Sequence, residues 1–351
     1  MDVEKFLTAI SEAAGISGYE FPVAQLIKAE MSKHADEMRE DTLGNVVIYK
    51  RGGGEDRQRI LIAAHMDEIG LMVTKIERGG FLRFTTVGGI DLRTIVGQEV
   101  IVFGKEKIPG ILGAKAPHIT SSEERSKPYP SEDLYIDLAL PEDDVKRIVS
   151  VGDLVMISRK AVKLHGKRIA GKAMDDRAGV AVLLSCLQEL SRLEHTADLY
   201  AVATVQEEVG IRGATTATYG IVPDIGIAVD VTHGEMPGVD EHRTSCLGKG
   251  PAIAVGPNIH PRVGQELIRI AKEYNIPHQL EAAPGPTGTD ARAIQVSRDG
   301  IATGLVSVPL RYMHTSVELL DLEDIKMAGR LLAYFVAAVN REFVEELKCY
   351  C

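Results

Sequence analysis

The chain has 351 residues, enough for one large domain or two, and 45% of them are hydrophobic, so a sizeable core can form. Its formal net charge of −10 argues against nucleic acid as a partner, because phosphate binding needs a basic surface. The longest apolar run, LLAYFVAAV at 331–339, falls far short of the ~20 residues that span a bilayer, so no membrane partner is expected.

Residues 1–15 predict an amphipathic helix, because Phe6, Leu7, Ile10 and Ala14 follow helical spacing. This segment lacks the basic n-region of a signal peptide. The four cysteines form no C-x-x-C pair, and without an export signal they are expected to be reduced thiols. The sequence therefore predicts a cytoplasmic protein.

A second helix is expected over 17–31. Ser17 and Glu20 have the spacing of a capping box, and Pro22 suits the first turn of a helix. Two strands, NVVIYK (45–50) and RILIAAH, then flank the turn RGGGEDR.

The segment from about residue 70 to 163 has a different pattern. Short strand-like pieces recur there, separated by glycine, proline and charged turns, which predicts an all-β, barrel-like module. Its long polar loop, 115–133, is expected to be either a functional lid or disordered. The expected strands are 70–76, 81–87, 98–104, 109–114, 134–140 and 153–158.

Beyond this module, strands alternate with helices, which predicts a layered α/β sheet. We therefore expect a discontinuous α/β domain, residues 1–66 and 167–351, interrupted by a β-rich insertion at 67–166. A buried helix face is marked by Val180, Leu183, Leu184, Leu187 and Leu190. The expected strands are 199–205, 225–231, 252–257 and 304–310, and the expected helical segments include 260–275 and 323–347.

Ionisable side chains follow the apolar strands of this α/β part. Open α/β sheets place their sites outside the carboxyl ends of their strands, so residues far apart in sequence can meet there. Two imidazoles and several carboxylates without cysteine suit zinc, cobalt or manganese. The residues at the strand ends are His65, Asp67, Asp175, Asp176, Glu207, Glu208, Asp230 and His314.

Local spacing suggests separate tasks for neighbouring residues. His65 and Asp67 point the same way on an extended backbone, so Asp67 can hold the second ring nitrogen of a metal-bound His65. Glu207 and Glu208 face opposite sides, so one can bind metal while the other acts as a base. The same acids also have ordinary interpretations, since adjacent glutamates are usually solvated and an Asp pair before a helix usually caps it.

Charge balance favours two cations. Three carboxylate ligands, taken as Asp175, Glu208 and Asp230, carry four negative charges together with one hydroxide, and two divalent ions would balance them. A single ion would leave a buried excess of negative charge. The coincidence of five such strand ends argues against each acid being merely solvated.

Seven segments along the chain form a recognisable set: AAHMDEIG, GKAMDDRAG, VQEEVGIRGA, AVDVTHGEMPG, LGKGPAI, GTDARAI and RYMHT. Together they resemble the tetrahedral (TET) family of dinuclear metallo-aminopeptidases, some members of which carry glutamyl-aminopeptidase, deblocking-aminopeptidase or endoglucanase labels. The similarity runs along essentially the whole chain, in order.

The resemblance implies a role for each site residue. His65 and Glu208 would bind one metal ion, Asp230 and His314 the other, and Asp175 would bridge the two. Glu207 would be the general base and Asp67 the partner of His65. The peptide bond after Asp175 would be cis. The ions would be zinc or cobalt, with manganese also suitable.

The resemblance also implies a layered αβα metallopeptidase fold with a mixed sheet, and an inserted domain that mediates dimerisation. Dimers would assemble into a hollow dodecamer. The expected activity is removal of N-terminal residues from short peptides with a free N-terminus. One departure is Arg292, which follows GTDA where many relatives have a small residue; it either biases specificity or faces solvent.

Three other functions stay open at this point. A deacylase or carboxypeptidase would use the same cluster on another amide. A glycosidase, suggested by the endoglucanase labels, normally has aromatic platforms, yet the chain has no Trp and only 5% aromatic residues. A non-catalytic scaffold would leave the acids in water. Substrate preference is open as well, since Arg243, Arg292 and Arg311 are each candidates to recognise an acidic side chain.

Overall fold

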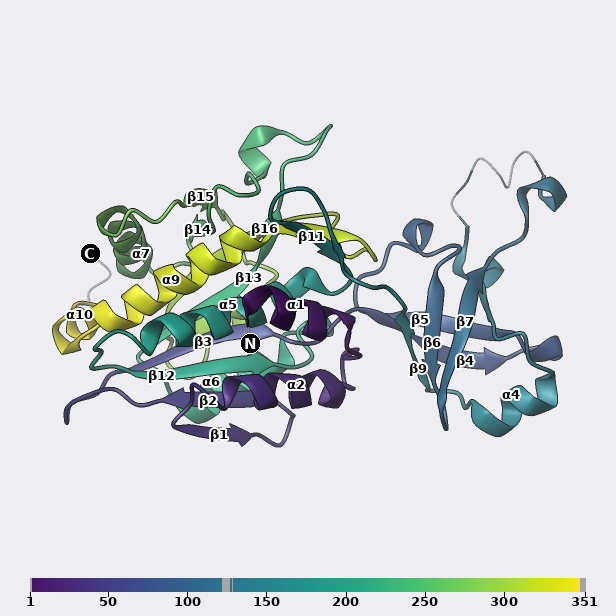
Figure 1. The fold of residues 1–351 in the computed structure, drawn as a ribbon, viewed down its shortest axis with the longest axis horizontal. Coiled ribbons are helices and arrows are strands. Elements are labelled where there is room, and N and C mark those ends of the chain that lie inside the picture. Colours follow the sequence, from purple (N-terminus) through teal and green to yellow (C-terminus); the bar gives the residue numbers. More distant parts are fainter. Residues whose placement is uncertain (1, 122–126, 128, 348–351) are drawn as a thin grey trace.

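The computed structural model describes residues 2–121, 127 and 129–347. Figure 1 shows two parts: a larger domain of helices around a sheet, and a smaller strand-rich domain beside it. The first and last described residues, Asp2 and Leu347, belong to the larger domain. The expected loop 115–133 lies partly outside the described residues, and so do Cys349 and Cys351.

The larger domain is built on a mixed sheet, as expected. Its path runs β1-β2-β12-β3-β13-β16-β17-β11-β10, and β14 joins β16 and β15 beside that path. The central neighbours β12, β3, β13 and β16 are parallel, whereas β2 and β17 pair antiparallel. The strands are β1 (Glu37–Glu40), β2 (Val46–Lys50), β3 (Arg59–His65), β10 (Val162–Lys163), β11 (Arg168–Gly171), β12 (Asp198–Thr204), β13 (Ile225–His233), β14 (Ala252–Val255), β15 (Gln279–Ala282), β16 (Ala302–Arg311) and β17 (Glu318–Asp321).

Helices cover both faces of this sheet, which confirms the layered α/β architecture. Successive residues of β3 point to opposite sides, so Ile60 and Ile62 pack in the core under one helix layer and Leu61 packs under the other. The first layer contains α1 (Val3–Glu12), α2 (Phe21–Met31), α5 (Met174–Leu190), α7 (Pro261–Glu273) and α9 (Leu322–Ala338). The second contains α6 (Arg212–Ile221) and α8 (Asp290–Gln295).

Helix α5 lies between the sheet and α9, and nearly every one of its side chains is buried. Because α5 is buried on all sides, its apolar residues are distributed around the whole helix and not along one face. Its N-terminus carries Asp175 and Asp176 into the domain interior. The two aspartates are held in the interior because the apolar helical turns that follow them in α5 pack in the main core.

Two local expectations were incomplete. The predicted capping box does not form, because Ser17 donates its hydroxyl to Asp67 Oδ2 at 2.6 Å and α2 begins later, at Phe21. The helical segment 323–347 is divided in two. Asn340 caps a separate helix, α10 (Arg341–Glu346), by accepting a hydrogen bond from the Phe343 N–H at 2.9 Å.

The smaller domain is a closed antiparallel barrel in the order β4-β5-β8-β7-β6-β9, and each of its strands matches a predicted piece. Alternate residues point inward and form a core of their own. Its elements are β4 (Gly70–Ile76), β5 (Leu82–Val87), β6 (Glu99–Phe103), β7 (Lys107–Gly113), β8 (Tyr135–Asp137), α4 (Glu142–Ile148) and β9 (Leu154–Ile157). The next strand, β10, already pairs in the large sheet.

None of the helices among the described residues combines the length and apolarity that crossing a membrane requires. Of the cysteines that the structure describes, Cys186 is buried and Cys246 is exposed, and both are free thiols.

Candidate metal centre

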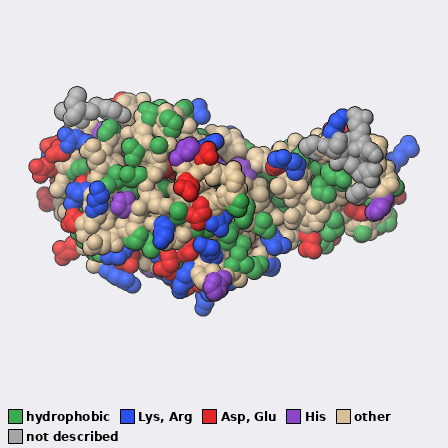
Figure 2. Space-filling view, turned by 90° about the horizontal axis from the view of Figure 1, so that it is seen from above, with side chains coloured by type: hydrophobic (Ala, Val, Ile, Leu, Met, Phe, Trp, Pro, Cys, Tyr) green, Lys and Arg blue, Asp and Glu red, His purple; other side chains and the backbone are tan. Residues whose placement is uncertain are grey.

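The strand ends meet, as the sequence predicted. The end of β3 brings His65 beside Thr204 of β12, and Asp230 comes from the neighbouring strand β13. One cavity of about 540 Å³ is lined by all the predicted metal ligands together with Glu207. Figure 2 shows acidic and histidine side chains side by side near the middle of the larger domain.

Asp175 lies at the centre of the site and faces both imidazoles. Its Oδ1 is 3.2 Å from Nε2 of His65, and its Oδ2 is 3.2 Å from Nε2 of His314. Two groups of donor atoms share this carboxylate: one adds His65 and Asp230, the other adds Glu208 and His314. Within each group the donor atoms lie within 4.8 Å of one another.

The two groups combine the residues differently from the expected division. His65 is grouped with Asp230 and not with Glu208, while His314 lies 3.4 Å from Oε1 of Glu208. The strand ends suggested these residues as candidate ligands, but how they group depends on where the loop after β16 places His314. That placement is a tertiary feature without a signal in local spacing.

The donor set fits divalent cations. Imidazole nitrogens and carboxylate oxygens, without a thiolate, are ligands that zinc, cobalt and manganese accept. Burial, with neighbouring carboxylates adding to it, raises the pKa of Glu208 to about 7 and that of Asp230 well above its ordinary value. Burial raises the pKa of Glu207 to about 8. Against the effect of burial, hydrogen bonds to Asp175 and Asp67 raise the pKa of His65 well above its ordinary value, and the hydrogen bond to Asp175 raises that of His314 to about 9. Cations bound among these groups would take the place of the imidazole protons.

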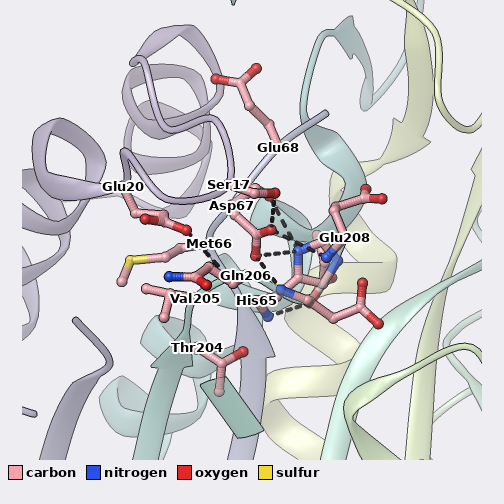
Figure 3. Close-up of polar contacts among 12 residues, drawn as sticks. Ser17, Glu20, His65, Met66, Asp67, Glu68, Thr204, Val205, Gln206 and Glu208 are labelled. Atoms are coloured by element: carbon pink, nitrogen blue, oxygen red, sulfur yellow. Dashed lines mark hydrogen bonds and ion pairs between the residues drawn. The ribbon is translucent and has the colours of Figure 1, made fainter. Parts of the chain in front are cut away.

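Asp67 holds the two glutamates and His65 together. Its Oδ1 accepts a hydrogen bond from the Glu207 N–H at 2.9 Å, and its Oδ2 accepts one from the Glu208 N–H at 3.2 Å. Nδ1 of His65 lies 3.2 Å from the Asp67 carbonyl oxygen and 3.5 Å from its Oδ1. The Ser17 hydroxyl completes the arrangement (Figure 3). Asp67 is fully buried, so these contacts fix its carboxylate.

The turn at Glu207 receives a further contact from Glu20, which sequence reasoning had assigned to a helix cap. Oε1 of Glu20 accepts hydrogen bonds from the N–H group of Gly18 and from that of Gln206, the second of which is drawn in Figure 3. Gln206 has a positive φ of 56°, the left-handed conformation that turns the chain after β12. The backbone before Glu207 is therefore fixed from both sides.

The Asp175–Asp176 peptide bond is cis, as the resemblance implied. Asp176 is fully buried, and its carboxylate accepts hydrogen bonds from the N–H groups of His65 at 3.2 Å and Gly179 at 2.9 Å. This contact joins the end of β3 to the start of α5. Asp176 thus supports the site without being among the grouped donors.

Two further residues that sequence reasoning missed control His314. Glu318 accepts hydrogen bonds from the His314 N–H at 2.7 Å and from the Asp175 N–H at 3.1 Å, so one carboxylate joins both loops. Nδ1 of His314 lies 2.7 Å from the carbonyl oxygen of Gly89, which belongs to the barrel domain. Neither residue carries a recognisable signal, since Glu318 begins a strand and Gly89 follows another glycine.

A buried ion cluster anchors the loop after β3. Glu68 accepts hydrogen bonds from Lys172 at 2.7 Å and from Arg177 at 3.1 Å. Arg177 is fully buried and also donates to carbonyl groups at the end of α1, including that of Ala13. The N-terminal helices are therefore tied to the segment that carries Asp175.

The fold and this site define a metal-dependent peptidase of the α/β class. The sequence model described as M42 glutamyl aminopeptidase matches residues 44–331, and the chain belongs to that family. It is accordingly a metal-dependent aminopeptidase.

Individual relatives cover nearly the whole chain. A lysyl aminopeptidase of Pyrococcus furiosus is 36% identical over 337 residues, which cover 93% of this chain and 96% of the relative. The crystal structure of a TET aminopeptidase from a marine sediment Thaumarchaeota archaeon has a TM-score of 0.93 and 34% identity, with 98% of each chain covered. The TET1 peptidase of Pyrococcus horikoshii, which can assemble into a tetrahedron or a large octahedral shell, has a TM-score of 0.85 and 32% identity, with 96% of this chain and 100% of that chain covered.

Proposed function

We propose that the enzyme removes N-terminal residues from short peptides with two divalent cations, one at each donor group. The observation that carries this proposal is the orientation of Asp175, whose two oxygens each face a different imidazole at 3.2 Å. His65 and Asp230 would hold one ion, Glu208 and His314 the other, and Asp175 would bridge them. Zinc, cobalt and manganese all suit these ligands, and availability decides among them.

Cations held there would polarise the scissile carbonyl and make a bound water more acidic. Glu207 supplies the base. It lines the cavity but belongs to neither donor group, so its carboxylate stays free to take a proton from the attacking water and to pass it to the leaving amine. Its backbone N–H is held by Asp67, which fixes where that carboxylate starts.

The ring orientations come from acceptors behind the imidazoles. Asp67 faces Nδ1 of His65 and Gly89 faces Nδ1 of His314, so each ring presents Nε2 to Asp175. Acceptors of this kind fix the tautomer and the ring plane of a metal-ligating histidine. Both ligands are therefore oriented before a cation arrives.

Release of p-nitroaniline from leucyl-p-nitroanilide, with zinc, cobalt or manganese added in turn, tests the activity. An aminopeptidase requires the free amine, so the N-acetylated substrate should be inert. Preferential cleavage of the blocked substrate would instead indicate a deacylase-type amidohydrolase. Metal analysis should find about two ions per chain; one ion per chain at full activity would contradict the bridging role of Asp175.

The barrel is proposed as a dimerisation domain. In the division suggested by the sequence, it is an insertion at 67–166 in a catalytic domain formed by 1–66 and 167–351. It has its own core and lies beside the catalytic domain (Figure 1), which leaves its outer surface available to a second copy. Assembly of dimers into a dodecamer is proposed from the relative that forms a tetrahedron. Mass measurement in solution tests this, and a stable monomer would contradict it. Free Cys186 and Cys246 support a cytoplasmic location.

A further inference from the structure

The cavity contains one carboxylate that the proposed reaction does not use. Glu281, on β15, lines the same cavity as the metal ligands and Glu207. Its Oε1 accepts a hydrogen bond from the Thr232 hydroxyl at 2.8 Å. Its Oε2 is buried and has no hydrogen-bond partner among the described residues. A buried acceptor without a partner is costly, so this oxygen is poised to receive a donor.

We propose that Glu281 binds the cationic side chain of the substrate's N-terminal residue, so that the enzyme prefers peptides beginning with lysine or arginine. This inference rests on the aminopeptidase reaction proposed above and adds the substrate class. A lysine ammonium or an arginine guanidinium offers the charged donors that a carboxylate oxygen lacks.

The charges around the cavity favour a cationic ligand. No lysine or arginine is found among the described residues that line it. The three arginines considered for acidic substrates are engaged or exposed elsewhere: Arg311 pairs with Glu235 at 2.7 Å, and both Arg243 and Arg292 are exposed outside the lining. An acidic side chain would therefore meet carboxylates without a permanent positive partner.

Position separates a side-chain role from binding of the α-amine. Thr232 lies two residues beyond Asp230 on β13, on the same face, so the two positions are ~6.6 Å apart along the strand. The α-amine of a substrate is only two bonds of about 1.5 Å from the scissile carbon. A lysine ammonium stands about 6 Å from its Cα, at the end of a four-carbon stem. The separation of the Asp230 and Thr232 positions along β13 is therefore similar to the length of a lysine side chain and longer than the distance from the α-amine to the scissile carbon.

The local chemistry allows this contact. The terminal torsion of a glutamate side chain is soft, so a rotation of the carboxylate would turn Oε2 toward the cavity, and the Thr232 hydroxyl, whose hydrogen rotates freely, would follow it. Burial raises the pKa of Glu281, and the Thr232 hydrogen bond and His233 partly offset that effect. A cationic side chain entering the cavity would oppose the cost of burial and favour the ionised carboxylate.

The test compares lysyl-p-nitroanilide with norleucyl-p-nitroanilide, which keeps the aliphatic stem but lacks the charge. The wild-type enzyme should cleave the lysyl substrate with at least about tenfold higher kcat/KM. Glu281→Gln should lower this ratio about 10- to 100-fold, the usual effect of losing a charge-assisted hydrogen bond, with norleucyl cleavage within about threefold of wild type. Glu281→Lys should favour glutamyl-p-nitroanilide over the lysyl substrate.

Glu241→Gln is the matched control, because Glu241 is an exposed glutamate in η5 (Glu241–Arg243) outside the cavity lining, and the ratio should not change. Glu281→Asp retains the carboxylate and should keep more of the lysyl preference than Glu281→Gln. Equal losses on both substrates, or a wild-type enzyme without lysyl preference, would overturn the assignment. If the metal-loaded enzyme cleaves neither substrate nor leucyl-p-nitroanilide, the reaction itself has been misassigned.

Discussion

Glu207 and Glu208 are adjacent in the chain, yet their carboxylates lie in different surroundings. Both backbone N–H groups donate to Asp67, so one buried side chain sets the direction in which each glutamate leaves the backbone. Glu208 joins Asp175 and His314 in a donor group, whereas Glu207 belongs to neither group. The two positions should therefore respond differently to the same isosteric change.

Glu207→Gln should retain the fold and metal content but lower kcat by about 10²- to 10⁴-fold, because the amide cannot accept the proton. Steady-state kinetics on leucyl-p-nitroanilide with metal analysis of the same sample measures both. Glu208→Gln provides the contrast, since it should lower metal content as well. Near-normal turnover in metal-replete Glu207→Gln protein would show that another group acts as the base.

At the scale of elements, α9 holds a neighbouring loop through one buried acid. Asp324, in the first turn of α9, accepts hydrogen bonds from the N–H groups of Gly248 and Gly250, both at 2.7 Å. Burial, partly offset by these hydrogen bonds, raises its pKa to about 6. The folded chain therefore binds more protons than the unfolded chain between about pH 4 and 6, and the contribution of Asp324 to stability falls as the pH rises through that window.

Asp324→Asn should remove this titration. The free energy of unfolding of the wild type, relative to that of Asp324→Asn, should fall by on the order of 3 kcal/mol as the pH rises from about 4 to 7. Urea unfolding of both metal-free proteins across this range measures the difference. A constant difference would mean that Asp324 is ionised in the folded chain throughout.

A second element-scale prediction concerns the turn after β5. A Cβ added at Gly89 would lie 3.1 Å from Nδ1 of His314, so Gly89→Ala should push the ring away from its acceptor and lower metal affinity at that group about 10- to 100-fold. Metal titration by calorimetry measures this affinity. Gly220→Ala, on the surface of α6 where an added Cβ meets nothing within 4 Å, should leave it unchanged. Equal affinities in both variants would exclude a role for Gly89.

Elements with strong patterns were predictable. β3 and β13 are long and apolar and carry ionisable residues at or near their ends, so both the strands and the candidate ligands His65 and Asp230 could be found in the sequence. β1 (EMRE) and β15 (QLEA) could not, because charged edge strands have little apolar pattern and depend on their neighbours. Glu281 was missed for that reason. The grouping of His65 with Asp230 has no signal in the sequence, because it depends on distances across the sheet, which spacing does not encode.

At the scale of the whole molecule, the two domains have separate hydrophobic cores. The larger domain is packed on both faces of its sheet, and the barrel is packed around its own interior. The donor groups belong to the larger domain. Cations that bind only the folded state stabilise it in proportion to their saturation.

Chelation should therefore lower the unfolding temperature of the larger domain while leaving a barrel transition nearly unchanged. At about 100 times the dissociation constant, each ion contributes about 2.7 kcal/mol, which corresponds to roughly 5–10 °C for a domain of this size. Scanning calorimetry with and without chelator measures the shift. A single transition that moves as a whole would show that the two domains unfold together.

The turn at Gly88 and Gly89 places part of the barrel domain against the proposed metal site. A Cβ at Gly88 would come within 3.3 Å of Oε2 of Glu208, and Gly89 already provides the acceptor for His314. A tilt of the barrel relative to the sheet would therefore disturb His314 and Glu208, the two proposed ligands of one ion. A neighbouring subunit bound to the barrel would therefore influence the orientation of the His314 ring. A variant that lacks the insertion should lose most of its activity even if the remaining sheet folds correctly.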